Sequence, residues 1–445
     1  MPSRSLGTGR EEADDTGTRG AHGRRGRVPR SSAPPHGVIT ARPFAGSRIL
    51  LGITGGIASY KSVWLARLLT QAGAEVDVVM TRGAREFVGP ITFEAVTARA
   101  VHTEIFGPGH ALDHIRLARE ANVIVVAPAT ADFVGRAAHG LADDLLTACL
   151  LAAQSKVLLV PAMNDRMWSH AQTKRNVAHA RSLGYEILEP AEGPLAVGEG
   201  SGPGRMPEPD EIMSHVGRLL EGKSSLKGKR VIVTAGATRE PIDPVRFISN
   251  HSSGKMGVAL ARAAWRRGAE VTLIAGHVDI SLPPEIPTLS VDTVQEMSRS
   301  VAQNLPAADV LIMAAAPADF RPASQASEKI KKVGGSKRAV PQIVLEPTED
   351  ILQSTIPKRK KKSVIVGFAL ETSDGVKNAR EKLKAKDLDI VVLNDAKEPG
   401  AGFGVDTNRV TVLTRNGKEE ELDLMSKTDL AEILLDRVER ELNGR

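Results

Sequence analysis

Short apolar runs that end in glycine-containing turns recur along the chain and predict buried β-strands. Residues 48–53 form the first run, a helical pattern of apolar positions follows the turn at 54–56, and a second strand is expected at 75–79. This order of strand, helix and strand predicts a βαβ unit. A second such unit begins at residues 229–236, and Gly-Ala-Glu-Val recurs at the second strand of both units, through either duplication or convergent patterning.

The whole pattern predicts an α/β protein with two Rossmann-like, doubly wound domains. Helical stretches separate many of the apolar runs, which favours parallel sheets covered by helices on both faces. A short polar segment at 221–228 is the expected linker between domains at 48–220 and 229–445. Ligands bind such sheets at the carboxyl ends of the strands, so the loops there are the candidate sites. The further strands are expected at 123–127, 157–160, 310–314, 364–368 and 390–393.

The composition is that of an ordinary globular protein and excludes a membrane protein. Of the 445 residues, 41% are hydrophobic and 25% are charged, and no uncharged apolar run approaches the roughly 20 residues of a membrane-spanning helix. A single cysteine, Cys149, cannot form an intramolecular disulfide, and no secretory signal is evident, so we expect a cytoplasmic protein. Cys149 lies in an apolar helical run, where we expect it to pack rather than react.

The positive charge of the chain is concentrated near its start. Residues 1–47 hold eight Arg and four acidic residues, and so carry +4 of the formal net charge of +6. They are too poor in apolar residues to offset the entropy of ordering, so we expect a disordered basic extension. A nucleic-acid-binding arm and an organelle transit peptide are the alternatives. The charge of the remaining chain does not predict nucleic-acid binding.

Five loops of the first domain carry candidate chemistry. The turn Gly55-Gly56 lies between a strand and a helix, where backbone N–H groups and the helix dipole favour a phosphate, although a tight structural turn explains it equally well. The other loops are 80–81, 127–132, 140–146 and 161–164. With them the chain resembles the flavin-containing cysteine decarboxylases, and more closely the decarboxylase half of the bifunctional phosphopantothenoylcysteine decarboxylase/phosphopantothenate–cysteine ligase family.

The resemblance implies a flavodoxin-like domain that binds FMN and decarboxylates 4′-phosphopantothenoyl-cysteine. It marks His114 as the active-site histidine, for which a surface or core role is the alternative. It assigns Asn164 to substrate recognition, although this side chain could instead cap the helix that follows it. The residues implied around FMN are Gly55, Gly56 and Ser59 near the phosphate, and Thr81, Pro128, Ala129 and Thr130 near the flavin.

The flap that covers the substrate departs from the family pattern. The usual proton-donating cysteine is replaced by Val197, so another donor is required, and Glu199 is the nearest acid in the sequence. The alternative is that the ligase works while the decarboxylase is impaired or releases an enethiol. The residues that match the family's flap are Gly198, Gly204, Arg205 and Met206.

A long loop at 236–257 distinguishes the second domain. Its serines, glycines and cationic side chains lead into a helix start, an arrangement suited to a polyphosphate. The P-loop pattern is absent, so a Walker-type ATPase is rejected. With the segments 314–320, 328–332 and 367–372, the loop resembles the ligase half of the same family. The resemblance then covers about residues 48–440.

For the second domain the resemblance implies a ligase that uses CTP to activate the carboxylate of 4′-phosphopantothenate as an acyl-cytidylate, which the amine of cysteine attacks. Asn250 and Lys329 would be catalytic, with Asn250 stabilising the oxyanion formed on attack. Magnesium would bridge phosphate oxygens of CTP rather than occupy an all-protein cage. The residues implied at CTP are Met313, Ala314, Ala315, Asp319, Lys329, Asp350, Ile351, Phe368, Lys382 and Lys386.

Ordinary structural roles remain open for several of these residues. Lys382 and Lys386 are four positions apart on an expected helix and would also fit a solvated face. Phe368 would fit a core position and Asp319 a helix cap. The family usually carries Asn-Pro-Asp-Ile where this chain has Thr-Glu-Asp-Ile at 348–351, so its match to the base-recognition motif is incomplete.

The resemblance therefore predicts a bifunctional enzyme of coenzyme A biosynthesis. The second domain would make 4′-phosphopantothenoyl-cysteine, and the first would decarboxylate it to 4′-phosphopantetheine. Trimeric packing of the flavin domain and dimeric packing of the ligase domain would give a homododecamer. We expect small-molecule substrates and neither nucleic acid nor membrane as partners. A basic-tailed RNA-binding protein that reuses the two α/β folds is the alternative of a different class.

Overall fold

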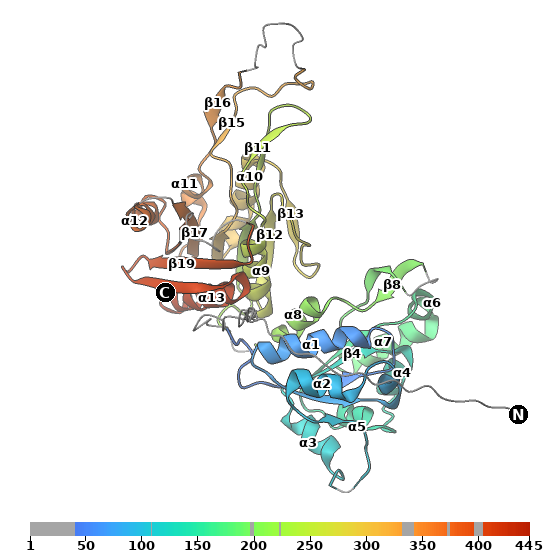
Figure 1. Cartoon of the computed structure of the whole chain (residues 1–445). Coiled ribbons are helices and arrows are strands. Elements are labelled where there is room, and N and C mark those ends of the chain that lie inside the picture. Colours follow the sequence, from blue (N-terminus) through green and yellow to red (C-terminus); the bar gives the residue numbers. More distant parts are fainter. Residues whose placement is uncertain are drawn as a thin grey trace, which may run out of the picture. The chain divides into compact units, whose positions relative to one another are not determined.

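The computed structural model describes residues 41–107, 109–195, 200–221, 224–331, 342–371, 374–395 and 404–445 (Figure 1). Within these ranges most strands belong to two large sheets, one between residues 48 and 187 and the other between residues 230 and 426. The two sheets and their helices confirm the predicted α/β class. No helix in the described part of the chain is long and apolar enough to cross a membrane.

The first sheet has six parallel strands in the order β3-β2-β1-β4-β5-β6, which is the order of a Rossmann fold. Successive residues of its first strand point to opposite faces, so that Leu50 and Leu51 join different core clusters and both faces are buried. The strands are β1 (Arg48–Ile53), β2 (Glu75–Met80), β3 (Val101–His102), β4 (Val123–Ala129), β5 (Lys156–Pro161) and β6 (Glu186–Ile187).

Helices cover both faces of the first sheet. One core cluster includes residues of α1 (Ser59–Gln71), α2 (Pro90–Thr97) and α8 (Pro209–Leu220). The other includes residues of α3 (Asp113–Glu120), α4 (Ala131–Ala138), α5 (Leu145–Leu151), α6 (Asp165–Ser169) and α7 (Ala171–Ser182). A short 3-10 helix, η1 (Arg82–Glu86), follows β2, and an antiparallel hairpin of β7 (Ala191–Pro194) and β8 (Ser201–Arg205) follows β6.

The second sheet has eight strands in the order β13-β12-β9-β14-β17-β18-β19-β20. The first six are parallel, as predicted, whereas β19 and β20 form an antiparallel edge that the sequence analysis did not predict. The strands are β9 (Arg230–Ala235), β12 (Glu270–Ala275), β13 (Thr288–Ser290), β14 (Val310–Met313), β17 (Val364–Glu371), β18 (Ile390–Asp395), β19 (Thr407–Thr414) and β20 (Glu419–Ser426).

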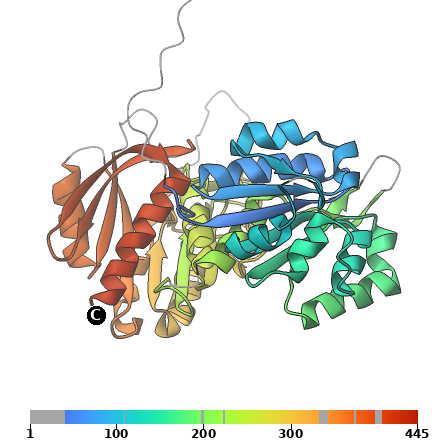
Figure 2. The ribbon, with the colours of Figure 1, turned by 90° about the horizontal axis from the view of Figure 1, so that it is seen from below.

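Helices also cover both faces of the second sheet. One cluster includes residues of α9 (Lys255–Arg266) and α13 (Lys427–Asn443), and Figure 2 shows α13 beside the edge strands near the C-terminus. The other includes residues of α10 (Val294–Asn304), α11 (Ile351–Ser354) and α12 (Gly375–Ala385). The remaining elements are two ribbons, β10 (Arg239–Pro241) with β11 (Phe247–Ser249) and β15 (Phe320–Pro322) with β16 (Leu345–Pro347), and two 3-10 helices, η2 (Leu305–Ala307) and η3 (Ile356–Lys358).

The end of the expected disordered extension is folded, so that prediction is wrong for residues 41–47. Phe44 is fully buried in the first core, and its backbone N–H donates to the carbonyl of Ala72 at 2.9 Å. Phe44 thus anchors a segment for which the composition predicted disorder. Residues 1–40 lie outside the described residues.

The segment expected as a polar linker makes contacts of its own. Leu226 is fully buried in the second core, and the hydroxyl groups of Ser224 and Ser225 donate to the carboxylate of Glu439 at 3.1 and 2.9 Å. Residues 224–228 are thus fixed to the second core. The domain boundaries at 220 and 229 stay a prediction.

Candidate functional site

A pocket of about 710 Å³ opens at the carboxyl ends of the first sheet. The turns after β1, β2, β4 and β5 line it, and β1 and β4 are the neighbours at which the strand order reverses. Ligands bind at this switch point of doubly wound sheets, in the crevice outside the carboxyl ends of the strands. The hairpin β7–β8 and the residue after it supply a further wall through Pro194 and residues 204–206.

Most of the residues expected around FMN line this pocket. They are Gly55, Gly56, Thr81, Pro128 and Thr130. Glycine is required at position 55, because a Cβ atom there would lie 2.8 Å from the carbonyl carbon of Gly83. Thr81 caps η1 and Thr130 caps α4 through their side-chain oxygens, so both helices start at the pocket.

Two of the expected FMN residues do not line the pocket. The Ser59 hydroxyl is buried and bonds within the chain, to the carbonyl of Gly56 at 2.6 Å and to that of Thr54 at 3.0 Å. The Ser59 hydroxyl therefore stabilises the Gly55-Gly56 turn and does not line the pocket. Ala129 is buried at the end of β4, beside the pocket residues Pro128 and Thr130.

Asn164 lines the pocket and also caps a helix. Its Oδ1 accepts the backbone N–H of Arg166 at 2.9 Å, the capping role considered as the alternative. The cap uses the oxygen of the carboxamide, whereas its NH₂ group can still donate to a ligand. The two roles are therefore compatible.

The flap hairpin is bonded to the loop that carries Asn164. The Met163 N–H donates to the Gly204 carbonyl at 2.9 Å, and a Cβ atom at Gly204 would lie 2.1 Å from the Met163 carbonyl oxygen. Glycine is therefore needed for this approach. Arg205 and Met206, the other expected flap residues, line the pocket with Gly204. Val197, Gly198 and Glu199 lie outside the described residues.

Charged residues that the sequence analysis did not assign to the site also line this pocket. Arg136 donates to Asp132 at 3.0 Å and to Asp144 at 2.7 Å. Burial acts to lower the pKa of Arg136, but its hydrogen bonds to Asp144 and Asp143 outweigh burial and raise it. The four-residue spacing of Asp132 and Arg136 on a helix was the available signal. Lys61 and Arg82 line the pocket as well.

His114 does not line the pocket of its own chain. It lies half-buried in the first turn of α3, and its Nδ1 is buried without a hydrogen-bond partner among the described residues. Its neighbours Leu112 and Ile115 are 70% and 44% exposed. A single chain therefore does not bring the expected catalytic histidine to the expected flavin site.

Cys149 lines neither this pocket nor the pocket at the carboxyl ends of the second sheet. Cys149 is fully buried on α5 in an apolar cluster, and burial raises the pKa of its thiol to about 12. The thiolate, which is the reactive form, is therefore scarce at neutral pH.

A second pocket, of about 510 Å³, opens at the carboxyl ends of the second sheet. The strand order reverses between β9 and β14, and the segment after β14 lines the pocket together with the start of α9. Ser252, Ser253 and Gly254 lead into α9, whose first turn has no side-chain cap, so its N–H groups can bind an anion. The expected CTP residues that line it are Met313, Ala314, Ala315, Asp319, Asp350, Ile351, Phe368, Lys382 and Lys386.

Two lysines and one carboxylate organise one end of the second pocket. Lys382 donates to the Phe368 carbonyl at 2.6 Å, and Lys386 pairs with Asp350 at 2.7 Å. Burial and the charge of Lys386 lower the pKa of Lys382. Burial acts to raise the pKa of Asp350, but the bond from Lys386 outweighs it and lowers that pKa. The lysines are thus parts of the pocket wall rather than members of a solvated face only.

Asn250 lines the second pocket, whereas Lys329 does not. The Asn250 carboxamide donates to the carbonyls of Ala316 and Pro317 at 3.3 and 3.0 Å, which fixes its orientation. Lys329 is exposed in the loop before residue 332 and is not brought to the pocket.

Three polar residues of the second pocket had no signal in the sequence analysis. The pocket is lined there by Asn394 of β18, Asn408 of β19 and Lys427 at the start of α13. Asn408 and Lys427 are 1% and 7% exposed. Single polar residues in strands and at helix starts are common, so the sequence pattern alone did not identify these three as pocket residues. In the described ranges no group of three His, Cys, Asp or Glu residues is placed to hold a metal ion.

The fold and the two pockets define a two-part α/β protein in which each Rossmann-like sheet has its own pocket at the carboxyl ends of its strands. The flavoprotein family matches residues 39–221, and the family described as the DNA/pantothenate metabolism flavoprotein C-terminal domain matches residues 226–442. Coenzyme A biosynthesis bifunctional protein CoaBC of Mycobacterium tuberculosis is 44% identical over 411 residues, 89% of this chain and 97% of that protein. The chain belongs to the family of these coenzyme A biosynthesis bifunctional proteins.

Other known proteins are similar over the whole chain or over one part of it. The protein of the same name from Bacillus subtilis is 44% identical over 395 residues, 88% of this chain and 96% of that protein. The solved C-terminal domain of a CoaBC protein is 36% identical and covers 50% of this chain and 100% of that domain, with a TM-score of 0.42. The solved FMN-dependent cysteine decarboxylase SpaF is 36% identical over 40% of this chain and 97% of its own, with a TM-score of 0.34.

Proposed function

We propose that this chain is a bifunctional enzyme of coenzyme A biosynthesis that ligates 4′-phosphopantothenate with cysteine and decarboxylates the product to 4′-phosphopantetheine. The observation that carries the proposal is the 44% identity to the CoaBC protein over 97% of that protein's length. Two separate pockets at the carboxyl ends of two sheets suit two successive reactions.

The first pocket fits FMN. Its volume of about 710 Å³ is within the range of cofactor sites, and turns rich in backbone N–H groups meet there at the starts of η1 and α4. Gly55 and Gly56 would approach the phosphate, with Thr81, Pro128 and Thr130 beside the flavin ring. When bound, FMN would supply reversible oxidation of the cysteinyl thiol, which makes loss of the carboxylate as carbon dioxide possible.

The residues of this chain would orient the substrate for that step. The NH₂ group of Asn164 would donate to the substrate carboxylate, because its oxygen is held by the helix cap. The flap hairpin, fixed through the Met163–Gly204 hydrogen bond, would cover the substrate and exclude water.

In the second pocket the start of α9 would bind the triphosphate of CTP. Ser252, Ser253 and the free N–H groups supply hydrogen-bond donors, and magnesium would bridge the phosphate oxygens. Attack of the 4′-phosphopantothenate carboxylate on the α-phosphorus would form the acyl-cytidylate and release pyrophosphate. The amine of cysteine would then attack the acyl carbon and release CMP.

Four residues of the pocket have parts in this ligation. Phe368, together with the Lys386–Asp350 pair, would border the nucleoside. Asn250 would donate to the oxyanion formed when the amine attacks, by exchanging its longer hydrogen bond, to the Ala316 carbonyl at 3.3 Å, for one to the oxyanion while the bond to Pro317 holds the side chain in place.

The decarboxylase site would be completed by a second copy of the chain. The buried Nδ1 of His114 has no hydrogen-bond partner in the described part of the chain, and exposed apolar residues, Leu112 and Ile115, lie on either side of it in the sequence, a pattern suited to a subunit interface. Trimeric packing of the first sheet domain would bring this histidine to the pocket of a neighbour. The homododecamer and the cytoplasmic location are part of the same proposal.

The test is a single reaction followed by mass spectrometry. Purified protein given 4′-phosphopantothenate, cysteine and CTP is expected to yield 4′-phosphopantetheine, CMP, pyrophosphate and carbon dioxide. Asn250→Ala should lower ligation on the order of 100-fold, the usual loss for one oxyanion donor, while supplied 4′-phosphopantothenoyl-cysteine is still decarboxylated. Asn304→Ala, outside both pockets, is the matched control and should retain both activities.

The products also separate the proposal from its alternative. Accumulation of an enethiol, or of 4′-phosphopantothenoyl-cysteine itself, would indicate a working ligase with the impaired decarboxylase that Val197 suggests. A colourless protein that releases no pyrophosphate from CTP would contradict both activities.

A further inference from the structure

A buried lysine lies beneath the flap hairpin of the first pocket. Lys61, on α1, is 8% exposed and lines the pocket. Its Nζ donates to Glu208 Oε1 at 2.9 Å and to the backbone carbonyl of Met206 at 3.1 Å. An ammonium group loses hydration on burial, and these two partners replace the lost water contacts.

Glu208 is shared between two cations. The Arg205 Nη2 also donates to Glu208 Oε1, at 2.5 Å, and Arg205 lines the same pocket. Two positive charges meet one negative charge, so the group of Lys61, Glu208 and Arg205 carries a net charge of about +1 when all three are ionised. This excess charge lies at the pocket wall that the flap hairpin forms.

The backbone on both sides of Arg205 is fixed as well. On one side the Gly204 carbonyl accepts from Met163, and on the other the Met206 carbonyl accepts from Lys61. The first of these bonds is between backbone groups, whereas the second depends on the Lys61 side chain. Lys61 therefore holds both the peptide that follows Arg205 and the carboxylate that Arg205 contacts.

We propose that Lys61 is a positioning residue of the decarboxylase, which holds Arg205 toward the anionic substrate and maintains the positive charge of that pocket wall. The inference rests on the proposed function, because the substrate of that reaction carries a phosphate and a carboxylate. Arg205 makes the contact with one of these anions, and Lys61 acts through Glu208 and the peptide of Met206.

The test compares Lys61→Met and Lys61→Arg with wild-type protein. Supplied 4′-phosphopantothenoyl-cysteine is the substrate, and kcat and KM are measured separately. Lys61→Met should raise KM about tenfold or more with a smaller change in kcat, since the lost interaction is a charge-assisted one that binds rather than reacts. Lys61→Arg keeps the charge, so its KM should lie close to the wild-type value.

Ionic strength gives a second readout. Salt screens charge, so the wild-type KM should rise with added salt, and the KM of Lys61→Met should rise less steeply. Lys156→Met is the matched control: that side chain is 62% exposed at the start of β5, and its loss should leave kcat, KM and the salt response unchanged. Pyrophosphate release from CTP and the visible flavin absorbance report folding of the two parts.

The KM values of the variants either support or overturn the positioning role of Lys61. An unchanged KM in Lys61→Met, or a Lys61→Arg variant as poor as Lys61→Met, would overturn it. If Lys61→Met lacks flavin, Lys61→Gln, which can still donate to the Met206 carbonyl but is uncharged, replaces it and should show the same rise in KM. Wild-type protein that releases no carbon dioxide would contradict the proposed function itself, whereas an active wild type with a normal Lys61→Met contradicts this inference alone.

Discussion

His114 shows how a single residue can need a second chain to have a role. Its side chain is half-buried on α3 and does not line the first pocket. The histidine ring can steer or exchange a proton near neutral pH only where a substrate reaches it. In the proposed trimer, the substrate that reaches His114 would be bound in the pocket of a neighbouring copy.

A mixing experiment tests this arrangement. His114→Gln and Asn164→Ala should each abolish decarboxylation alone, but co-expressed chains should regain roughly a quarter of wild-type activity, the share of sites that random pairing leaves intact. Ligation should be unaffected in all samples. No recovery in mixed oligomers would place both residues in the site of one chain and contradict the proposal.

At the residue scale, the sequence predicted glycines and loop residues better than charged ones. Gly55 and Gly204 are fixed by close backbone approach, which leaves a signal in the sequence as an obligatory glycine. Lys61 and Lys427 left no such signal, because a lysine side chain is usually solvated, and only tertiary packing buried these two. Lys329 was predicted at the second pocket and is exposed elsewhere.

The helix α8 combines two half-buried ionisable groups with opposite pH dependence. Burial, and then the charge of Glu285, raise the pKa of Glu211 to about 7. Burial, and then the charge of Arg218, lower the pKa of His215 to about 4. His215 also packs edge-on against Trp265 of α9, with ring centroids 4.8 Å apart. The fold therefore favours the neutral form of both side chains.

The two groups should respond to pH in opposite directions. The contribution of Glu211 is fully present below its ordinary pKa of 4.5 and is lost as pH rises through about 7. The contribution of His215 is fully present above its ordinary pKa of 6.5 and is lost as pH falls through about 4. Between pH 4.5 and 6.5 the changes in these two contributions therefore largely cancel.

Removing either group should expose the response of the other. In Glu211→Gln the melting temperature should fall more steeply than in wild type as pH is lowered from 6.5 to 4. In His215→Phe it should fall more steeply as pH is raised from 4.5 to 7. Melting curves between pH 4 and 8 measure both, and parallel pH profiles for all three proteins would contradict the assignment.

At the scale of elements, the parallel strands were predictable and the antiparallel edge was not. Fully apolar runs such as residues 310–313 mark strands that are buried on both faces. In β19, Val410 and Val412 are buried whereas Arg409 is exposed, an alternation interrupted by threonine and asparagine. Such a short mixed pattern does not distinguish an edge strand from a loop.

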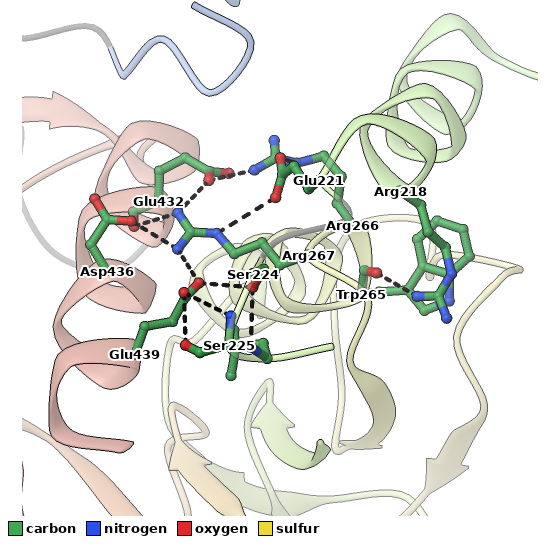
Figure 3. A network of polar contacts seen from close by, with 11 residues as sticks. Arg218, Glu221, Ser224, Ser225, Trp265, Arg266, Arg267, Glu432, Asp436 and Glu439 are labelled. Atoms are coloured by element: carbon green, nitrogen blue, oxygen red, sulfur yellow. Dashed lines mark hydrogen bonds and ion pairs between the residues drawn. The ribbon is translucent and has the colours of Figure 1, made fainter. Parts of the chain in front are cut away.

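For the molecule as a whole, a buried ionic network ties the end of α8 to α9 and α13 (Figure 3). Arg266 bonds to Glu221 at 2.8 Å and also to Glu432, which in turn accepts from Arg267 at 3.0 Å. Arg267 further pairs with Glu439 at 2.8 Å. The side chains of Arg266 and Glu432 are only 6% and 7% exposed, so neither can regain water if its partner is removed.

Replacing a buried member of this network should destabilise the fold far more than replacing an exposed member. Glu432→Gln is expected to destabilise the fold by about 3–5 kcal/mol, the usual loss when a buried pair is broken. Asp436→Asn removes an Arg267 partner that is 51% exposed and should cost about 1 kcal/mol or less. Denaturant midpoints for the loss of ligase activity measure both, and equal shifts in the two variants would contradict a dominant buried pair.

The burial of Cys149 makes the chain a ready scaffold for site-specific labelling. A thiol with a pKa of about 12 and no exposed surface should not react with a maleimide at neutral pH, so a cysteine introduced on the surface would be the single attachment point for a fluorophore. Lys156→Cys is a suitable choice, since that side chain is 62% exposed at the start of β5. The fluorophore would then be attached without replacing the native Cys149.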